Sequence, residues 1–209
     1  MAKLPAPPPA EVLATRAPAD LVAVTRATVL WRIYFAEGPH TGRWDGFRSY
    51  GPLNTARFDH HLPPPHEQER AILYVGLAIA TAVAEVFQDT RVIDRRRRAP
   101  WLVGFRLRRA VRLLDLAGDW PTRAGASQAI SSGRRDRARQ WSDAIYDAYP
   151  EAEGLWYRSS MHGGEPAMAL YERARGALRA RPEIHLPLAH PGLEVPLGRM
   201  AVSLGYLLA

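Results

Sequence analysis

The sequence predicts an α+β fold in a single compact domain, and three features support this prediction. The chain has 209 residues, a length that suits one domain and leaves little room for a second. Hydrophobic residues make up 47% of the chain, which is enough for a packed core and excludes a mostly disordered protein. Strand-like and helix-like segments intermix without the regular alternation of a doubly wound parallel sheet.

The chain begins with a proline-rich segment. Four of the first nine residues are proline, and they interrupt any apolar stretch of the kind a signal peptide needs. We therefore expect a flexible or polyproline-like lead-in over residues 1–25 and a folded domain over residues 26–209. The longest uncharged run, residues 71–84, has fourteen residues, whereas a membrane span needs about 20. We expect a cytoplasmic protein with no membrane partner.

The first strand of the domain is predicted over residues 29–35, where β-branched and aromatic residues predominate. Residues 36–66 mix glycine, proline, histidine and aromatic residues, which indicates an ordered irregular loop. Residues 72–75, Ile-Leu-Tyr-Val, have the composition of a short buried strand.

A helix is predicted over residues 77–89, and it carries one conspicuous charge. At 100° per residue, one side of this helix is apolar and consists of Ile79, Val83, Val86 and Phe87. Thr81, Glu85 and Gln88 fall on the opposite side, which faces either water or a site. A carboxylate among apolar residues is costly unless it is paired with arginine or used. Glu85 is therefore a candidate site residue.

The second half of the chain continues the mixture of strands and helices. Large apolar residues alternate with others over residues 101–107, as in a half-buried strand. A helix is expected over residues 134–149, because Pro150 follows its end. The remaining expected elements are strands at 111–116, 155–158, 183–188 and 193–197 and a helix over 166–179.

The basic excess of the chain comes from one window. The chain has 28 basic and 21 acidic residues, and eight arginines with no acidic residue lie between Arg95 and Arg112. Without these eight, 20 basic residues would balance 21 acidic ones. The window is either a patch that binds nucleic acid or phosphate, or a solvated loop and strand edge where charge prevents unwanted pairing. We favour the second interpretation.

Several types of site are excluded or weakly supported. The chain has no cysteine, so disulfides, thiolate nucleophiles and zinc–cysteine sites are excluded. His60, His61 and His66 cluster in a proline-rich loop, but no second cluster completes a ligand set, and we expect no metal site. P-loop, GxGxxG, GxSxG and HExxH patterns do not occur.

An ordered set of short motifs runs through the chain: Trp31-Arg-Ile, Gly51-Pro, Ala56-Arg-Phe-Asp59, Ile72-Leu-Tyr-Val75, Ala84-Glu-Val-Phe87 and Gly154-Leu-Trp-Tyr-Arg-Ser159. In this order and spacing the chain resembles the RES domain family, named for an arginine, a glutamate and a serine, over roughly residues 29–175. The resemblance implies a fold similar to that of ADP-ribosyltransferases, with a mixed sheet flanked by helices. It also implies a bacterial toxin that is encoded beside an Xre-like antitoxin and consumes NAD.

The resemblance implies three catalytic residues. The family arginine falls on Arg32, the helix glutamate on Glu85 and the serine on Ser159, with Ser160 as an alternative one residue away.

The resemblance also implies substrate-binding residues. A second family arginine falls on Arg57, in an Ala-Arg-Phe-Asp stretch where the family pattern is Gly-Arg-Trp-Asn. Gly42-Arg43-Trp44-Asp45 is closer in letters, but we prefer Arg57 because the tyrosine strand follows it after a modest loop. Tyr74 matches the strand tyrosine, and Ser127 is a weaker candidate to line the site.

These residue types suit cleavage of the bond between nicotinamide and ribose. A carboxylate stabilises the positive charge that develops on the ribose, and arginine binds the pyrophosphate through a planar fork of donors. Nicotinamide leaves without protonation, so no general acid is needed. NAD is then a substrate, no other cofactor is expected, and inorganic phosphate is a possible co-substrate. Water or a protein side chain are the alternative acceptors of ADP-ribose, and nucleic acid would be contacted only through the antitoxin.

Overall fold

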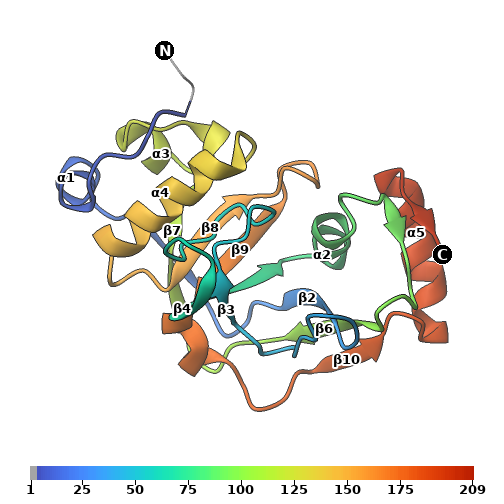
Figure 1. Ribbon diagram of the computed structural model, residues 1–209. Helices are drawn as coiled ribbons and strands as arrows, with labels where there is room; N and C mark the ends of the chain where they lie inside the picture. Colours follow the sequence, from blue (N-terminus) through green and yellow to red (C-terminus); the bar gives the residue numbers. More distant parts are fainter. Residues whose placement is uncertain (1–3) are drawn as a thin grey trace.

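The structure is a computed structural model that describes residues 4–209, and it is built around one nine-stranded sheet (Figure 1). The strands lie in the order β1-β7-β8-β9-β4-β2-β6-β10, with β3 paired to β4. All neighbours are antiparallel except β7 and β8, which are parallel. The strands are β1 Leu21–Val24, β2 Leu30–Phe35, β3 Arg48–Gly51, β4 His66–Gly76, β6 Pro100–Phe105, β7 Val111–Asp115, β8 Gly154–Arg158, β9 Pro166–Tyr171 and β10 Ile184–Pro187. This mixed sheet confirms the predicted α+β domain.

Helices pack on the sheet in two groups (Figure 1). The helices are α1 Ala10–Arg16, α2 Ile79–Val86, α3 Trp120–Arg123, α4 Arg135–Ala148 and α5 Glu194–Leu204. The first group, α1, α3 and α4, buries Trp120 and Trp141, whose rings meet edge to face at 6.4 Å. The second group, α2 and α5, packs on β2 and β6, and a short parallel pair lies beside it, β5 Val92–Ile93 with β11 Leu207–Leu208. The predicted helices over 77–89 and 134–149 correspond to α2 and α4.

The expected flexible lead-in over residues 1–25 is wrong for the part that the structure describes, because this segment contains α1 and β1. Leu13 and Ala17 are fully buried against the first helical group. The hydroxyl of Tyr149 donates to the carbonyl of Ala17 at 2.6 Å, and the indole of Trp141 donates to the carbonyl of Pro5 at 2.8 Å. Prolines set the start of α1 at Pro9 but do not prevent the following apolar residues from packing.

Two further expectations are wrong, and a third is incomplete. The helix expected over 166–179 is the strand β9 followed by a 3₁₀ helix, Glu172–Ala177. The central strand β9 is paired on both sides, to β4 and β8, so nearly all of its residues are buried and no alternation appears in the sequence. The strand expected at 193–197 is the first part of α5, which begins directly after a proline-containing 3₁₀ turn, Pro191–Leu193. The loop expected over 36–66 also contains β3.

Candidate functional site

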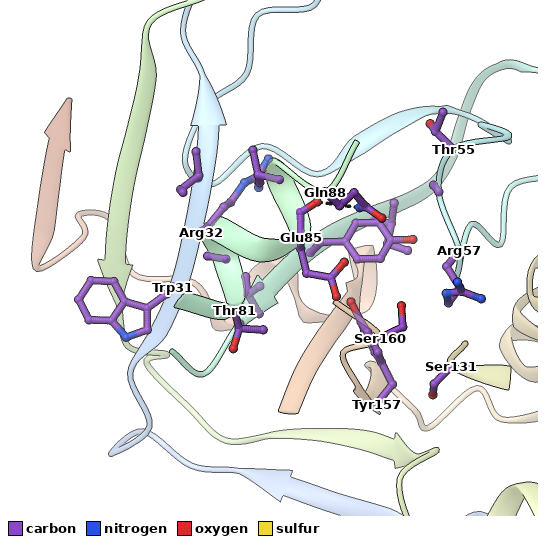
Figure 2. Close-up of a pocket in the computed structure, with 18 of the residues that line it drawn as sticks. Trp31, Arg32, Thr55, Arg57, Thr81, Glu85, Gln88, Ser131, Tyr157 and Ser160 are labelled. Atoms are coloured by element: carbon purple, nitrogen blue, oxygen red, sulfur yellow. Dashed lines mark hydrogen bonds between the residues drawn. The ribbon is translucent and has the colours of Figure 1, made fainter. Parts of the chain in front are cut away.

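A cavity of about 410 Å³ opens between α2, β2 and β4 (Figure 2). β2 and β4 are paired only through Trp31 and Gly76 and diverge beyond that point, so the sheet leaves room between them. A Cβ on Gly76 would lie 3.1 Å from the Cβ of Thr81, so the glycine lets the first turn of α2 approach β4 closely. The polar side of α2, which carries Thr81 and Glu85, faces this cavity and not open solvent, and Gln88, just after the helix, lines it too.

The carboxylate of Glu85 is held by the serine at the end of β8. The hydroxyl of Ser159 donates to Oε1 of Glu85 at 2.6 Å, and Ser159 as a whole is only 2% exposed. Oγ of Ser159 also accepts the backbone N–H groups of Met161 and His162, each at 3.1 Å. Ser160 lines the cavity directly. The two serines that the sequence left as alternatives therefore occupy different positions, one behind Glu85 and one at the cavity wall.

Arg32 lines the cavity from β2 and is held by carbonyl groups. Its Nη1 donates to the carbonyl of Gly46 at 3.0 Å and more weakly to that of Trp44 at 3.4 Å. Burial lowers the pKa of Arg32 to about 10, although the charge of Asp45 opposes this shift. The guanidinium therefore stays charged at neutral pH, and its hydrogen bonds leave Glu85 to another partner.

Arg57 lines the cavity from the loop between β3 and β4, whereas Arg43 does not line it. Nη1 of Arg57 donates to the carbonyl of Gly133 at 2.6 Å. Burial and the nearby charge of Arg135 lower the pKa of Arg57, and the charge of Glu85 opposes this. The side chain of Arg43 is 79% exposed and pairs with a carboxylate two residues away. The structure thus brings the preferred arginine into the site.

Tyr74 lies on the part of β4 that lines the cavity. Its hydroxyl oxygen accepts the backbone N–H of Phe58 at 3.1 Å. Burial is the main cause that raises the pKa of Tyr74 well above its usual range, so the phenol stays neutral. The hydrogen bond ties β4 to the residue that follows Arg57 and so fixes the position of that arginine.

The structure adds site residues that the sequence did not indicate. Arg135, the first residue of α4, lines the cavity, and its Nη2 donates to Oε1 of Gln88 at 2.8 Å. Ser131 also lines the cavity, whereas Ser127 is not among the lining residues. The Ser127 hydroxyl instead accepts the N–H of Ala129 and caps a 3₁₀ helix, Gln128–Ile130. No local pattern marks Ser131 or Arg135, because only the packing of α4 brings them to the cavity.

Comparison with known families identifies the domain. The sequence profile of the RES domain matches residues 29–190. The chain belongs to the RES domain family. Sequence comparison with curated proteins gives no significant match. Among solved structures, the chain is similar to one from the crystal structure of the M. tuberculosis MbcT-MbcA toxin-antitoxin complex, with 13% identity and a TM-score of 0.52 over 86% of this chain and 92% of that one. This likeness shows a shared fold.

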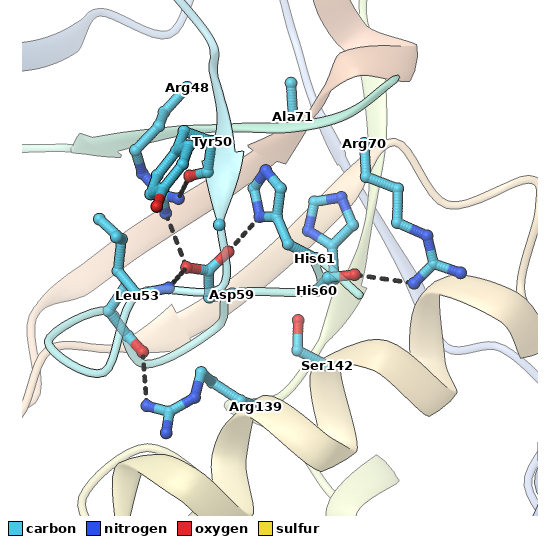
Figure 3. A network of polar contacts seen from close by, with 12 residues as sticks. Arg48, Tyr50, Leu53, Asp59, His60, His61, Arg70, Ala71, Arg139 and Ser142 are labelled. Carbon is cyan, nitrogen blue, oxygen red and sulfur yellow. Dashed lines mark hydrogen bonds and ion pairs between the residues drawn. The ribbon is translucent and has the colours of Figure 1, made fainter. Parts of the chain in front are cut away.

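In this RES domain, a buried acidic residue organises the loop that carries Arg57 (Figure 3). Asp59 is 1% exposed and accepts hydrogen bonds from Nη2 of Arg48 at 3.0 Å, from the N–H of Leu53 at 2.6 Å and from Nδ1 of His61. Burial alone would raise the pKa of Asp59, but the bond from His61, the charge of Arg48 and the Leu53 amide hold it below its usual range. Arg48 also lines the cavity, but its charge is already neutralised by the ion pair with Asp59.

A second acidic residue lies at the end of β9 and ties the sheet to α4. Glu172 accepts the hydroxyl of Tyr146 at 2.6 Å and the N–H of Ala71 at 2.9 Å, and its Oε2 lies 3.5 Å from Nε2 of His60. Burial would raise the pKa of Glu172, but the contacts with His60, Tyr146 and Ala71 outweigh it and lower the pKa to about 2. Glu172 does not line the cavity, so its contacts join β4, α4 and the end of β9 outside it.

Within residues 4–209, no group of three or more histidine, aspartate or glutamate side chains is arranged to hold a metal ion. None of the helices within the same residues is long and apolar enough to cross a membrane.

Proposed function

We propose that this RES domain is the toxin of a toxin–antitoxin pair and consumes NAD by cleaving the bond between nicotinamide and ribose. The observation that carries the proposal is the carboxylate of Glu85, which a neutral serine holds at a cavity with arginine side chains in its wall. The similarity in fold to a chain of a toxin–antitoxin complex supports the assignment. An Xre-like antitoxin is the proposed partner, and the cytoplasm, which holds NAD, is the proposed site of action.

The proposed reaction begins with departure of nicotinamide. The bond between ribose C1′ and the nicotinamide nitrogen breaks, and its electron pair leaves with the now neutral nicotinamide. Positive charge develops on C1′ and the ring oxygen, and the negative charge of Glu85 stabilises it. An oxygen of phosphate, water or a protein side chain then bonds to C1′, and its proton passes to the solvent. Arg32 and Arg57 offer guanidinium donors to the pyrophosphate.

The other residues of the proposed site position the reacting groups or bind the substrate. Ser159 orients the carboxylate of Glu85, and the neutral phenol of Tyr74 fixes the loop that carries Arg57. Ser160 offers a hydroxyl at the cavity wall for a polar group of the substrate. Transfer of ADP-ribose to a protein would use the same residues and differ only in the acceptor.

The basic window between Arg95 and Arg112 gives little support to a nucleic-acid-binding module. Three of its eight arginines pair with separate acidic residues: Arg95 lies 3.7 Å from Glu194, Arg106 pairs with Glu183, and Arg109 pairs with Glu153 at 2.6 Å. The N–H groups of Arg96 and Arg97 bond to Asp94 in a tight turn. These separate ion pairs and this turn fit a solvated edge better than one continuous patch that binds nucleic acid.

The test is nicotinamide release from NAD by the purified protein, with and without inorganic phosphate. We expect release by the wild type and a loss of about 100-fold or more in Glu85→Gln, the order of effect seen when a transition-state stabiliser is removed. Glu69→Gln is the matched control, because Glu69 is exposed on β4 and does not line the cavity. Equal rates for wild type and Glu85→Gln would refute the role of Glu85. No release by the wild type with water, phosphate or a cell-extract acceptor would refute NAD cleavage.

A further inference from the structure

One polar group in the cavity wall has no hydrogen-bond partner in the part of the chain that the structure describes. The side chain of Ser131 is 5% exposed, and its Oγ makes no hydrogen bond to any of residues 4–209. Ser131 nevertheless lines the cavity. A buried hydroxyl without a partner costs about 1–3 kcal/mol, so such groups in native proteins usually meet a ligand or ordered water. The orphaned hydroxyl of Ser131 therefore indicates that this part of the wall receives a polar group.

Two positive charges lie beside this hydroxyl. Arg57 and Arg135 line the same cavity, and the charge of Arg135 is close enough to lower the pKa of Arg57. Two like charges that are close enough to shift a pKa also repel each other. Among residues 4–209 neither guanidinium forms an ion pair within 4.0 Å, because Arg57 bonds to the carbonyl of Gly133 and Arg135 to the amide of Gln88. Both guanidinium groups retain N–H donors for an anion.

The local fold concentrates these groups. Ser131, the Gly133 carbonyl that holds Arg57, and Arg135 lie within five consecutive residues at the start of α4. The positive end of the α4 dipole adds to their charge. In Figure 2, Arg57 and Ser131 lie on one side of Glu85 and Arg32 on the other. The acidic residues of the cavity wall are Glu85 and Asp89, of which Glu85 is bonded to Ser159.

We propose that Arg57, Arg135 and Ser131 form a subsite that binds one phosphate group. This inference rests on the proposed function in one respect only, the identity of the molecule that carries the phosphate. A guanidinium fork and a hydroxyl are the donors that phosphate oxygens accept. The group is either a phosphate of the dinucleotide or free inorganic phosphate, and both present the same chemistry to these side chains.

The first experiment measures binding without catalysis. Purified protein is titrated separately with inorganic phosphate and with pyrophosphate at fixed ionic strength, and binding is followed by calorimetry. Arg135→Gln and Ser131→Ala are compared with wild type. Arg137→Gln is the control, because it removes the same charge from the same helix at a residue that does not line the cavity. Thermal unfolding of each variant verifies that it is folded.

We expect Arg135→Gln to weaken binding of at least one probe by about tenfold or more, the effect of one charge-assisted hydrogen bond. Ser131→Ala is expected to weaken it by a smaller factor, and Arg137→Gln to match wild type. Unchanged affinity in Arg135→Gln, or an equal loss in Arg137→Gln, would overturn the subsite. If Arg135→Gln does not fold, Ser131→Ala decides, and unchanged affinity in that variant overturns the proposal.

The second experiment identifies the source of the phosphate group. Nicotinamide release is measured while NAD and inorganic phosphate are varied independently. A raised KM for NAD in Arg135→Gln assigns the subsite to the dinucleotide, and a raised KM for phosphate with an unchanged KM for NAD assigns it to the free anion. Both KM values unchanged would contradict the subsite. A wild type that releases no nicotinamide defeats the proposed function, while the binding experiment still tests the subsite.

Discussion

Ser159 provides a sharp test of the site, because the sequence alone left it interchangeable with Ser160. The change is Ser159→Ala, with Ser160→Ala as its matched neighbour. Ser159 donates to the carboxylate of Glu85 at 2.6 Å and accepts two backbone N–H groups. Ser160 is exposed at the cavity wall and is not part of that set of hydrogen bonds. The Ser159→Ala and Ser160→Ala variants should therefore differ in stability and in activity.

The magnitude follows from the bonds that are lost. A hydrogen bond to a charged group contributes about 1.5–3 kcal/mol, and two N–H groups lose their acceptor as well. We expect the free energy of unfolding of Ser159→Ala to fall by about 2–3 kcal/mol, which lowers Tm by roughly 5–10 °C in a chain of this size. Exposed substitutions usually change stability by less than about 0.5 kcal/mol, so Ser160→Ala should melt close to wild type.

The effect on the reaction should separate orientation from binding. Without Ser159 the carboxylate of Glu85 can rotate away from its position, so kcat for nicotinamide release should fall by about tenfold or more, which corresponds to about 1.4 kcal/mol of barrier. KM for NAD should change less, since Ser159 is behind Glu85 and acts through it. Ser160→Ala should instead raise KM. Unchanged Tm and kcat in Ser159→Ala, or a larger loss of kcat in Ser160→Ala, would refute this reasoning.

Three further predictions concern the supports of the site. Glu172→Gln should lower the free energy of unfolding at pH 7 by about 2–3 kcal/mol. Because the folded pKa of Glu172 is about 2 against an ordinary 4.5, the stabilisation by this carboxylate is complete above pH 4.5 and is lost as the pH falls to 2. Denaturant titrations over this pH range check it, and a constant difference between variant and wild type would contradict it. Asp59→Asn leaves Arg48 beside a neutral group and should lower the free energy of unfolding by about 3 kcal/mol. The loss would appear as a lower urea midpoint at an unchanged m value, and an unchanged midpoint would show that the buried carboxylate is dispensable. Tyr74→Phe removes the acceptor of a backbone N–H and should raise KM for NAD several-fold with little change in kcat, and an unaltered KM would separate Tyr74 from the Arg57 loop.

The sequence predicted those helices and strands that have one buried and one exposed face, because their apolar residues then recur at the period of the element. The helix around Glu85 and the helix over 134–149 both have one buried side, and the strand over 29–35 is rich in strand-forming residues. The strand β9 was mistaken for a helix because pairing on both sides and burial on both faces erase its period of two. The first helix was missed because the surrounding prolines mask the buried Leu13.

The candidate site was predictable only where a short motif and a strand or helix coincide. Glu85 stood out as one charge on an otherwise apolar helix, and Arg32 and Tyr74 lie on strands that the sequence indicates. Their chemical roles stay predictions. Arg135 and Ser131 are far from these residues in the sequence and reach the cavity only because α4 packs beside the loop that carries Arg57. That is a tertiary contact, and no local pattern encodes it.

The pairing of charges in the cavity follows a rule that fits the proposed chemistry. Arg48 is neutralised by Asp59, which belongs to the support of the loop. Arg32 and Glu85, in contrast, are each held by neutral groups, carbonyls for the arginine and a serine hydroxyl for the carboxylate. A direct ion pair between them would cancel both fields and leave neither for a substrate. Neutral anchors fix the two side chains in place while their charges stay available, as a site needs when it binds an anionic dinucleotide and stabilises a cationic transition state.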